Sequence, residues 1–201
     1  MAKRKAKKPT STSVRTPATA GLRAALNRRS KAELVSVLLE LAQADRGILR
    51  QLTARFGVVA PPKELIAPTR RAIADATDFD ERDMNTNFDY DYEAYEEVQR
   101  NLARLIASGQ LGEAMQLSLE LMKEGSHQVE MSDEGMMTND IEECLNVVIQ
   151  GLKKCELPAA EIIAWCSAML DSDRVKFIAR EPLQSLQNRF GKGKGATLPK
   201  K

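Results

Sequence analysis

The chain has 201 residues, of which 43% are apolar and 4% aromatic; it can therefore build a core of aliphatic side chains, and disorder throughout is excluded. The net charge of +2 combines basic ends with an acidic middle, because residues 1–31 hold ten Lys or Arg, residues 189–201 hold five, and all 28 acids lie between these segments. Three cysteines without a CxxC spacing argue against a disulfide framework, and no apolar run is long enough for a membrane span, so we expect a cytoplasmic protein without a metal or cofactor.

Both ends of the chain are predicted to be disordered. Residues 1–29 consist mainly of Lys, Arg, Pro, Ser, Thr and Ala, with little to bury, although 22–29 could form a transient basic helix. Residues 191–201 form a flexible Gly/Lys tail. One helical domain is expected between these tails, at residues 30–190.

The first helical hairpin of this domain carries clear end signals. Ser30 and Glu33 have the spacing of a capping box, which opens a helix that runs to Ala44. Asp45 can cap a second helix, which Gly57 ends.

Six further helices follow from the apolar periodicity, and no window alternates like a strand. They are expected at residues 63–77, 93–107, 110–124, 140–154, 158–170 and 182–190, with an acidic connector at 78–92 and a polar loop at 125–137. The hairpins align weakly at a period of 46, which pairs Leu111 with Leu157, Ala114 with Ala160, and Leu117 with Ile163. The sequence therefore predicts an all-α fold of stacked antiparallel hairpins, a fragment of an α-solenoid of the tetratricopeptide or HEAT kind.

Several segments in this order resemble a known family. They are LVSVLLELAQADRGILRQL, the aromatic FDYDYEAYEEVQRNLARLIASGQLGEAMQLSLELM, the SDEG loop at 132–135, IEECLNVVIQGL and EIIAWCSAMLDSD. Residues 31–175 resemble the helical region that follows the zinc module in bacterial SWIM zinc-finger proteins. The CxC and CxH zinc ligands of that module are missing here, so the resemblance implies a scaffold for protein contacts rather than a zinc site.

The leading functional hypothesis is a non-enzymatic module for protein–protein interaction, which captures a partner helix or a basic peptide. Aromatic rings among acids can hold cations, and methionines form adaptable apolar surfaces. Tyr92 and Tyr95 could instead pack the start of the central hairpin, with Phe88 stapling it. The expected partner-binding residues are Asp89, Tyr90, Asp91, Tyr92, Tyr95, Met131, Met136 and Met137.

Three other features of the sequence have some of the residues of a functional site. Asp83, Asn85, Asn87, Asp89 and Asp91 follow the rhythm of a calcium loop, but Phe88 and Ala94 replace its Gly and Glu, which favours a solvated connector. His127 has no catalytic partners in view, and Cys144, Cys155 and Cys166 are expected in the core rather than on zinc. As the alternative function, the tails could bind nucleic acid through phosphate contacts alone, using Lys3, Arg4, Lys5, Lys7, Lys8, Arg28 and Arg29.

Overall fold

The computed structural model describes residues 17–58, 61–87 and 89–191. Ten α-helices and one short 3₁₀-helix are the regular elements within these ranges, which contain no strand, so the predicted all-α class is confirmed. Both predicted tails lie largely outside the described residues, at 1–16 and 192–201, and so does Phe88. None of the described helices is both long enough and apolar enough to cross a membrane.

Contacts divide the chain between Val59 and Ala60 into two compact units, so the range 30–190, which was expected to be one domain, spans both of them. Unit 1 contains α1 (Pro17–Leu26), α2 (Lys31–Ala44) and α3 (Arg46–Phe56). Unit 2 contains the 3₁₀-helix η1 (Pro62–Glu64) and the seven helices α4 (Ile66–Thr77), α5 (Glu81–Asn87), α6 (Tyr92–Ala107), α7 (Leu111–Met131), α8 (Thr138–Leu152), α9 (Ala159–Ser172) and α10 (Arg180–Gly191).

The end signals of unit 1 are confirmed at α2 and α3. The Ser30 hydroxyl accepts the Glu33 N–H at 3.2 Å, and the Glu33 carboxylate accepts the Ser30 N–H at 2.8 Å. The Asp45 carboxylate accepts the Ile48 N–H at 3.1 Å, and Gly57 has φ 61° after the end of α3. These caps depend only on local spacing, which is why the sequence predicted them.

Residues 17–29, which the structure describes, belong to the segment predicted to be disordered. Residues 17–26 form α1, which starts earlier than the transient helix expected at 22–29. Pro17 stands at the first helical position, where its missing N–H costs nothing, and the alanines that follow have the highest helix propensity.

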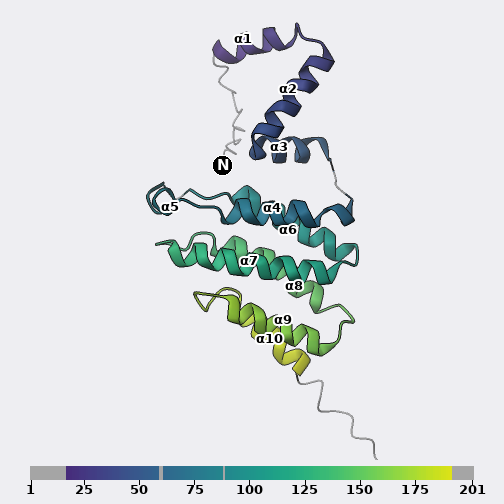
Figure 1. Ribbon diagram of the computed structural model, residues 1–201, viewed down its shortest axis with the longest axis vertical. Coiled ribbons are helices and arrows are strands. Elements are labelled where there is room, and N and C mark those ends of the chain that lie inside the picture. The colour runs from purple at the N-terminus through teal and green to yellow at the C-terminus, as the bar shows by residue number, and fades with distance from the viewer. Residues whose placement is uncertain (1–16, 59–60, 88, 192–201) are drawn as a thin grey trace, which may run out of the picture. The chain divides into compact units, whose positions relative to one another are not determined.

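Unit 2 consists of helix pairs in two layers (Figure 1). One layer holds α4, α7 and α9, with α7 packed against both of its neighbours, and the other holds α6, α8 and α10. Across the layers α4 packs on α6, α7 on α8, and α9 on α10. The core fills the space between these layers; its largest fully buried side chains are Tyr95, Leu65, Met84, Leu102, Leu105, Leu117, Leu121, Met122, Met137, Ile141, Leu145 and Ile149.

Buried positions recur along both layers at nearly constant spacing. From α6 to α8 the spacing is 47, and the equivalent buried pairs are Ala94/Ile141, Val98/Leu145, Asn101/Val148, Leu102/Ile149 and Leu105/Leu152. From α4 to α7 it is 49, with Leu65/Ala114, Thr69/Ser118, Ala72/Leu121, Ile73/Met122 and Ala76/Gly125. From α7 to α9 it is 48, with Ala114/Ile162, Leu117/Trp165, Ser118/Cys166 and Leu121/Met169.

This register corrects the predicted period of 46. Ala160, the predicted equivalent of the fully buried Ala114, is exposed, and burial instead pairs Ala114 with Ile162. The turn between α8 and α9, residues 153–158, is longer than the turn between α6 and α7, residues 108–110. The extra turn residues shift the second copy, and apolar periodicity alone does not reveal such a shift.

The loop expected at 125–137 is also corrected, because α7 continues to Met131. The loop was expected to start at Gly125, but a Cβ built on this glycine would lie 2.8 Å from Cδ1 of Ile141. The glycine therefore allows α7 and α8 to approach closely. The helix continues because Ser126, Gln128 and Val129 are buried beyond it.

Candidate functional site

Three connectors lie at the same end of the helix pairs, and we call this surface the connector edge (Figure 1). They are residues 78–91 between α4 and α6, residues 132–137 between α7 and α8, and residues 173–179 between α9 and α10. The turns between the helices at the opposite end, 108–110 and 153–158, are shorter than the first and third connectors and contain no helix, and η1 lies there at the start of α4. Long connectors on one edge leave room for side chains that no helix packing requires.

The first connector is fastened to the second through α5. The Asp80 carboxylate accepts the N–H groups of Arg82 and Asp83 at 2.9 and 3.0 Å and so starts this helix, where the sequence predicted only an irregular connector. The Asn85 amide donates to the Met131 carbonyl at 3.1 Å and accepts the Asp133 N–H at 2.9 Å. Asn85 thus satisfies a free carbonyl at the end of α7.

This arrangement argues against the calcium loop that was suggested by the spacing of Asp83, Asn85, Asn87, Asp89 and Asp91. Asp83, Asn85 and Asn87 lie on the helix α5, where Asn87 bonds to Asp83 at 3.4 Å. Asp91 instead caps α6, because its carboxylate accepts the Ala94 N–H at 3.0 Å. Oxygen donors divided between a helix and a cap do not converge as a calcium loop requires. No group of three or more metal-ligating side chains occurs in the described part of the chain.

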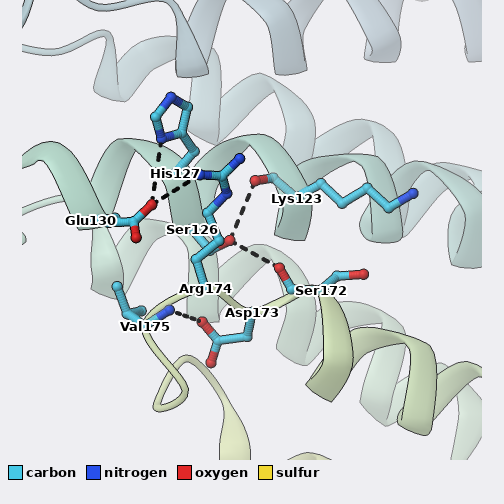
Figure 2. Close-up of polar contacts among 8 residues, drawn as sticks. All are labelled: Lys123, Ser126, His127, Glu130, Ser172, Asp173, Arg174 and Val175. Carbon is cyan, nitrogen blue, oxygen red and sulfur yellow. Dashed lines mark hydrogen bonds and ion pairs between the residues drawn. The ribbon is translucent and has the colours of Figure 1, made fainter.

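The third connector is held against α7 (Figure 2). Arg174 donates to the Glu130 carboxylate at 3.0 Å, and the Ser126 hydroxyl donates to the Ser172 carbonyl at 3.2 Å. Within the connector the buried Asp173 accepts the N–H groups of Val175 at 3.1 Å and Ile178 at 3.0 Å. All three connectors therefore have defined positions relative to the helices.

The same view places the single histidine. His127, expected in a loop, lies on α7, with Nδ1 3.7 Å from the Glu130 carboxylate. Its ring meets the Phe79 ring edge-on, with the centroids 5.8 Å apart. These contacts join the first connector to α7 and place the imidazole in a structural position.

The residues predicted to bind a partner fall into four groups. Tyr92 is 55% exposed, and Asp89 is exposed beside it. Tyr90 and Asp91 are engaged: the Tyr90 hydroxyl donates to Asp140 at 2.8 Å, and burial, followed by this hydrogen bond, raises the pKa of Tyr90 to about 12. Met131 packs partly buried against the core, and Met136 is half-buried.

Two of the predicted binding residues are wrong, because their side chains are in the core. Tyr95 is 1% exposed; its ring lies edge-on to Tyr90, and its hydroxyl donates to Gln128 at 2.5 Å. Met137 is fully buried, because the chain turns at Gly135, with φ 60°, and directs Met137 inward just before α8. Neither side chain can touch a partner while unit 2 is folded.

Phe177 was missed by the sequence reading, although it is 53% exposed in the third connector. The helix that follows Phe177, α10, aligns with α8 at a spacing of 38, which pairs the buried residues Ile141 with Ala179, Leu145 with Leu183 and Val148 with Leu186. In this alignment Phe177 occupies the position of Asn139 in α8 and of Tyr92 in α6. The one sequence feature that could have marked Phe177 is an aromatic residue among charged residues just before the last helix. Its equivalence to Tyr92 becomes visible only when the alignment of α10 with α8 and α6 is known.

Charge is concentrated on the same edge. Unit 2 has 25 acids and 13 bases within residues 61–191, a net charge of −12. The three connectors hold nine of the acids and three of the bases, so they contribute −6. A cationic ligand would be drawn towards this edge, and at physiological salt the attraction acts over about 8 Å.

The cysteines are core side chains where the sequence expected them. Cys144 and Cys166 are buried, and burial raises their pKa values to about 12 and about 11. Cys155 is half-buried. Because the thiolate is the nucleophile, a maleimide at neutral pH should label Cys155 first and reach the other two only in denaturant, as peptide mass spectrometry can measure. Rapid labelling of Cys144 in the folded protein would contradict the packing between α6 and α8.

The basic residues of the alternative nucleic-acid hypothesis lie mostly outside the described residues, namely Lys3, Arg4, Lys5, Lys7 and Lys8. Arg28 and Arg29 are described and exposed, and Arg29 lies 3.3 Å from Glu33. This pair is an exposed i,i+4 contact of the kind that contributes little to stability.

Comparison of the chain with protein-family models, curated proteins and solved structures finds no match. A functional assignment therefore depends on the geometry of the site.

Proposed function

We propose that the chain is a non-enzymatic protein-interaction module whose connector edge binds a basic segment of a partner protein. The observation that carries this proposal is the position of Tyr92 and Phe177. Among the described residues of unit 2 they are the two large hydrophobic side chains most exposed to water, at 55% and 53%. Phe177 lies in the third connector and Tyr92 starts α6 directly after the first, on an edge whose three connectors carry a net charge of −6.

The recurring burial at spacings of 47 to 49 supports a repeat architecture for unit 2. In an α-solenoid each helix pair buries its apolar face on the next pair, so buried positions recur at the repeat length. We therefore assign α4 with α6, α7 with α8, and α9 with α10 to three repeats of a tetratricopeptide- or HEAT-like solenoid fragment. Such folds commonly serve as scaffolds, which agrees with the resemblance to the SWIM-associated helical region.

The chemistry of the edge favours a basic segment over an acidic or purely apolar one. An exposed aromatic face attracts Lys and Arg through cation–π contact, which is worth about 0.5–2 kcal/mol. The neighbouring carboxylates add long-range attraction, which speeds association and sets specificity more than it adds affinity. The hydrogen bonds of Asn85, Glu130 and Asp173 hold the connectors in place, so little conformational entropy is lost on binding.

The ring contribution can be tested with a fluorescent peptide of repeated Lys-Lys-Leu units, and with a Glu-Glu-Leu counterpart as the ligand control. The full-length protein should bind the basic peptide selectively. The double variant Tyr92→Ala/Phe177→Ala should weaken binding by about 2- to 30-fold for each ring that makes a cation–π contact. Tyr92→Phe retains the ring and should bind almost normally. Fluorescence anisotropy measures each affinity, and melting temperatures should stay constant, because both rings are exposed.

Matched charge variants separate the edge from the general acidity of unit 2. Asp89→Asn/Glu134→Gln removes two exposed carboxylates from the connectors, and Glu156→Gln/Glu161→Gln removes two exposed carboxylates near the turn at 153–158. The first pair should weaken peptide binding more than the second at equal net charge. Equal losses would mean that the peptide follows net charge alone, and the proposal would fail.

A further inference from the structure

Unit 1 cannot bury its own apolar side chains. Ten of its large hydrophobic side chains are exposed, against two in unit 2, and Ala42 is its one buried hydrophobic residue among those described. A segment of this size rarely folds stably without an additional constraint or an oligomeric partner. The exposed side chains are Leu22, Leu26, Val35, Val37, Leu38, Leu39, Leu41, Leu49, Phe56 and Val58.

The apolar surface of α2 is too wide for α3 to cover. Viewed down the helix axis, with 100° per residue, the apolar side chains of α2 fill the arc between the directions of Val37 and Leu39. This arc is about 200° wide, roughly twice the width of an ordinary amphipathic stripe. Ala42, near the middle of this arc, is the buried residue of α2, whereas Leu38 at the centre of the arc is still 39% exposed. Side chains on both flanks of the arc stay exposed to water. On one flank Val37 is 47% and Leu41 46% exposed, and on the other Leu39 is 58% exposed. Covering both flanks takes two more helices, which a second hairpin supplies.

The charges of α2 and α3 indicate which kind of helical hairpin could pack against them. Residues 31–45, which comprise α2 and its C-terminal flank, hold Lys31 against Glu33, Glu40 and Asp45, a net charge of −2. Residues 46–56, which form α3, hold three arginines and no acid, a net charge of +3. A hairpin with one acidic and one basic helix is complementary to a copy of itself when α2 of each copy faces α3 of the other.

We propose that the α2–α3 hairpin docks on the same hairpin of a second copy of this chain and forms a four-helix bundle. A two-fold pairing uses the same patch on both copies, which suits one exposed face on every chain. Four helices around a shared apolar centre would bury both flanks of α2, in the arrangement of four-helix bundles. The chain would then present two copies of unit 2 in one dimer.

Sedimentation equilibrium of the full-length chain tests this proposal. The wild type should be a dimer. Leu39→Glu/Leu41→Glu places one charge on each flank, at side chains already exposed in the hairpin, and should raise the dimer dissociation constant at least about 100-fold, because burying an unpaired charge is costly. Gln43→Glu adds a charge on the polar side of the same helix and should leave the dimer intact. A wild type that stays monomeric, or forms another oligomer, would overturn the proposal.

A charge-swap mixture then checks that α2 of one copy meets α3 of the other. Leu49→Lys/Phe56→Lys, at exposed side chains of α3, should also be monomeric, but mixing it with Leu39→Glu/Leu41→Glu should restore a heterodimer detectable by native mass spectrometry. Circular dichroism of each variant controls for loss of helix. Dimers of either variant alone, or failure of the mixture to associate while helix content is retained, would place the interface elsewhere and refute the proposal.

Discussion

Replacing Gln128 with leucine is expected to lower the free energy of unfolding of unit 2 by about 2–5 kcal/mol. The Gln128 amide donates to the Ala76 carbonyl at 3.2 Å and accepts the Tyr95 hydroxyl at 2.5 Å, and the side chain is fully buried. Ala76 lies in the last turn of α4, where carbonyls have no partner inside the helix. Leucine fills a similar volume but leaves two buried polar groups unpaired, each costing about 1–3 kcal/mol. Chemical denaturation monitored by circular dichroism measures the change.

A double variant provides the control for this network. Tyr95→Phe alone leaves only the side-chain oxygen of Gln128 without its hydrogen-bond donor. It should therefore lower the free energy of unfolding by less than Gln128→Leu does. Tyr95→Phe/Gln128→Leu leaves only the Ala76 carbonyl unpaired, so it should be more stable than Gln128→Leu by itself. Additive losses would show that the two side chains do not depend on each other, contrary to the hydrogen bond between them.

Gly125→Leu should destabilise unit 2 by about 3 kcal/mol or more, since overpacking a tight contact costs 1–3 kcal/mol and occasionally more. A Cβ at this position would already lie 2.8 Å from Cδ1 and 3.2 Å from Cγ1 of Ile141, and leucine extends further in that direction. The clash outweighs the helix propensity of leucine, which favours it over glycine by up to about 1 kcal/mol. Thermal unfolding of the full-length chain gives the difference.

Two variants distinguish a clash from a general effect on α7. Adding Ile141→Ala to Gly125→Leu should recover part of the loss, because it removes the side chain that the leucine would strike. Gly112→Leu, in the same helix, meets nothing within 4 Å and should leave stability unchanged or slightly higher. If the Gly112 variant were equally destabilised, close packing between α7 and α8 would not be the reason for Gly125.

The sequence was sufficient to predict the structural features that depend on residues only a few positions apart. Ser30 with Glu33, Asp45, and Gly57 are all local signals, and each ends or begins a helix as expected. Gly109, which has φ 81° in the turn between α6 and α7, belongs to the same class. The stripes of α6 and α8 were likewise predictable, because the 3.6-residue period of a helix is written in consecutive residues.

What the sequence could not predict depends on residues far along the chain. In the sequence Gly125, like Gly57, is a glycine that follows a helical apolar pattern. Only the position of the Ile141 side chain shows that Gly125 allows close packing instead of ending a helix. The repeat register differs from the predicted one because the turn at 153–158 is longer than the turn at 108–110. The apolar periodicity within a helix carries no information on the length of a turn.

The region of the candidate site and some of its residues were predicted from the sequence. The segment 89–92 does contribute an exposed acid and an exposed ring, Asp89 and Tyr92. Tyr95, three positions later, has the same aromatic character but faces Gln128 in the core. Phe177 joins this edge only through the stacking of α9 and α10 on the preceding pairs, so no local pattern pointed to it.

The most direct test of the proposed binding edge is amide hydrogen exchange of the full-length protein with and without the Lys-Lys-Leu peptide. Binding at the connector edge predicts slower exchange in residues 78–91, 132–137 and 173–179, and unchanged exchange at the turns 108–110 and 153–158. Slowing confined to those two turns, or spread evenly over the acidic surface of unit 2, would contradict a binding site on the connector edge.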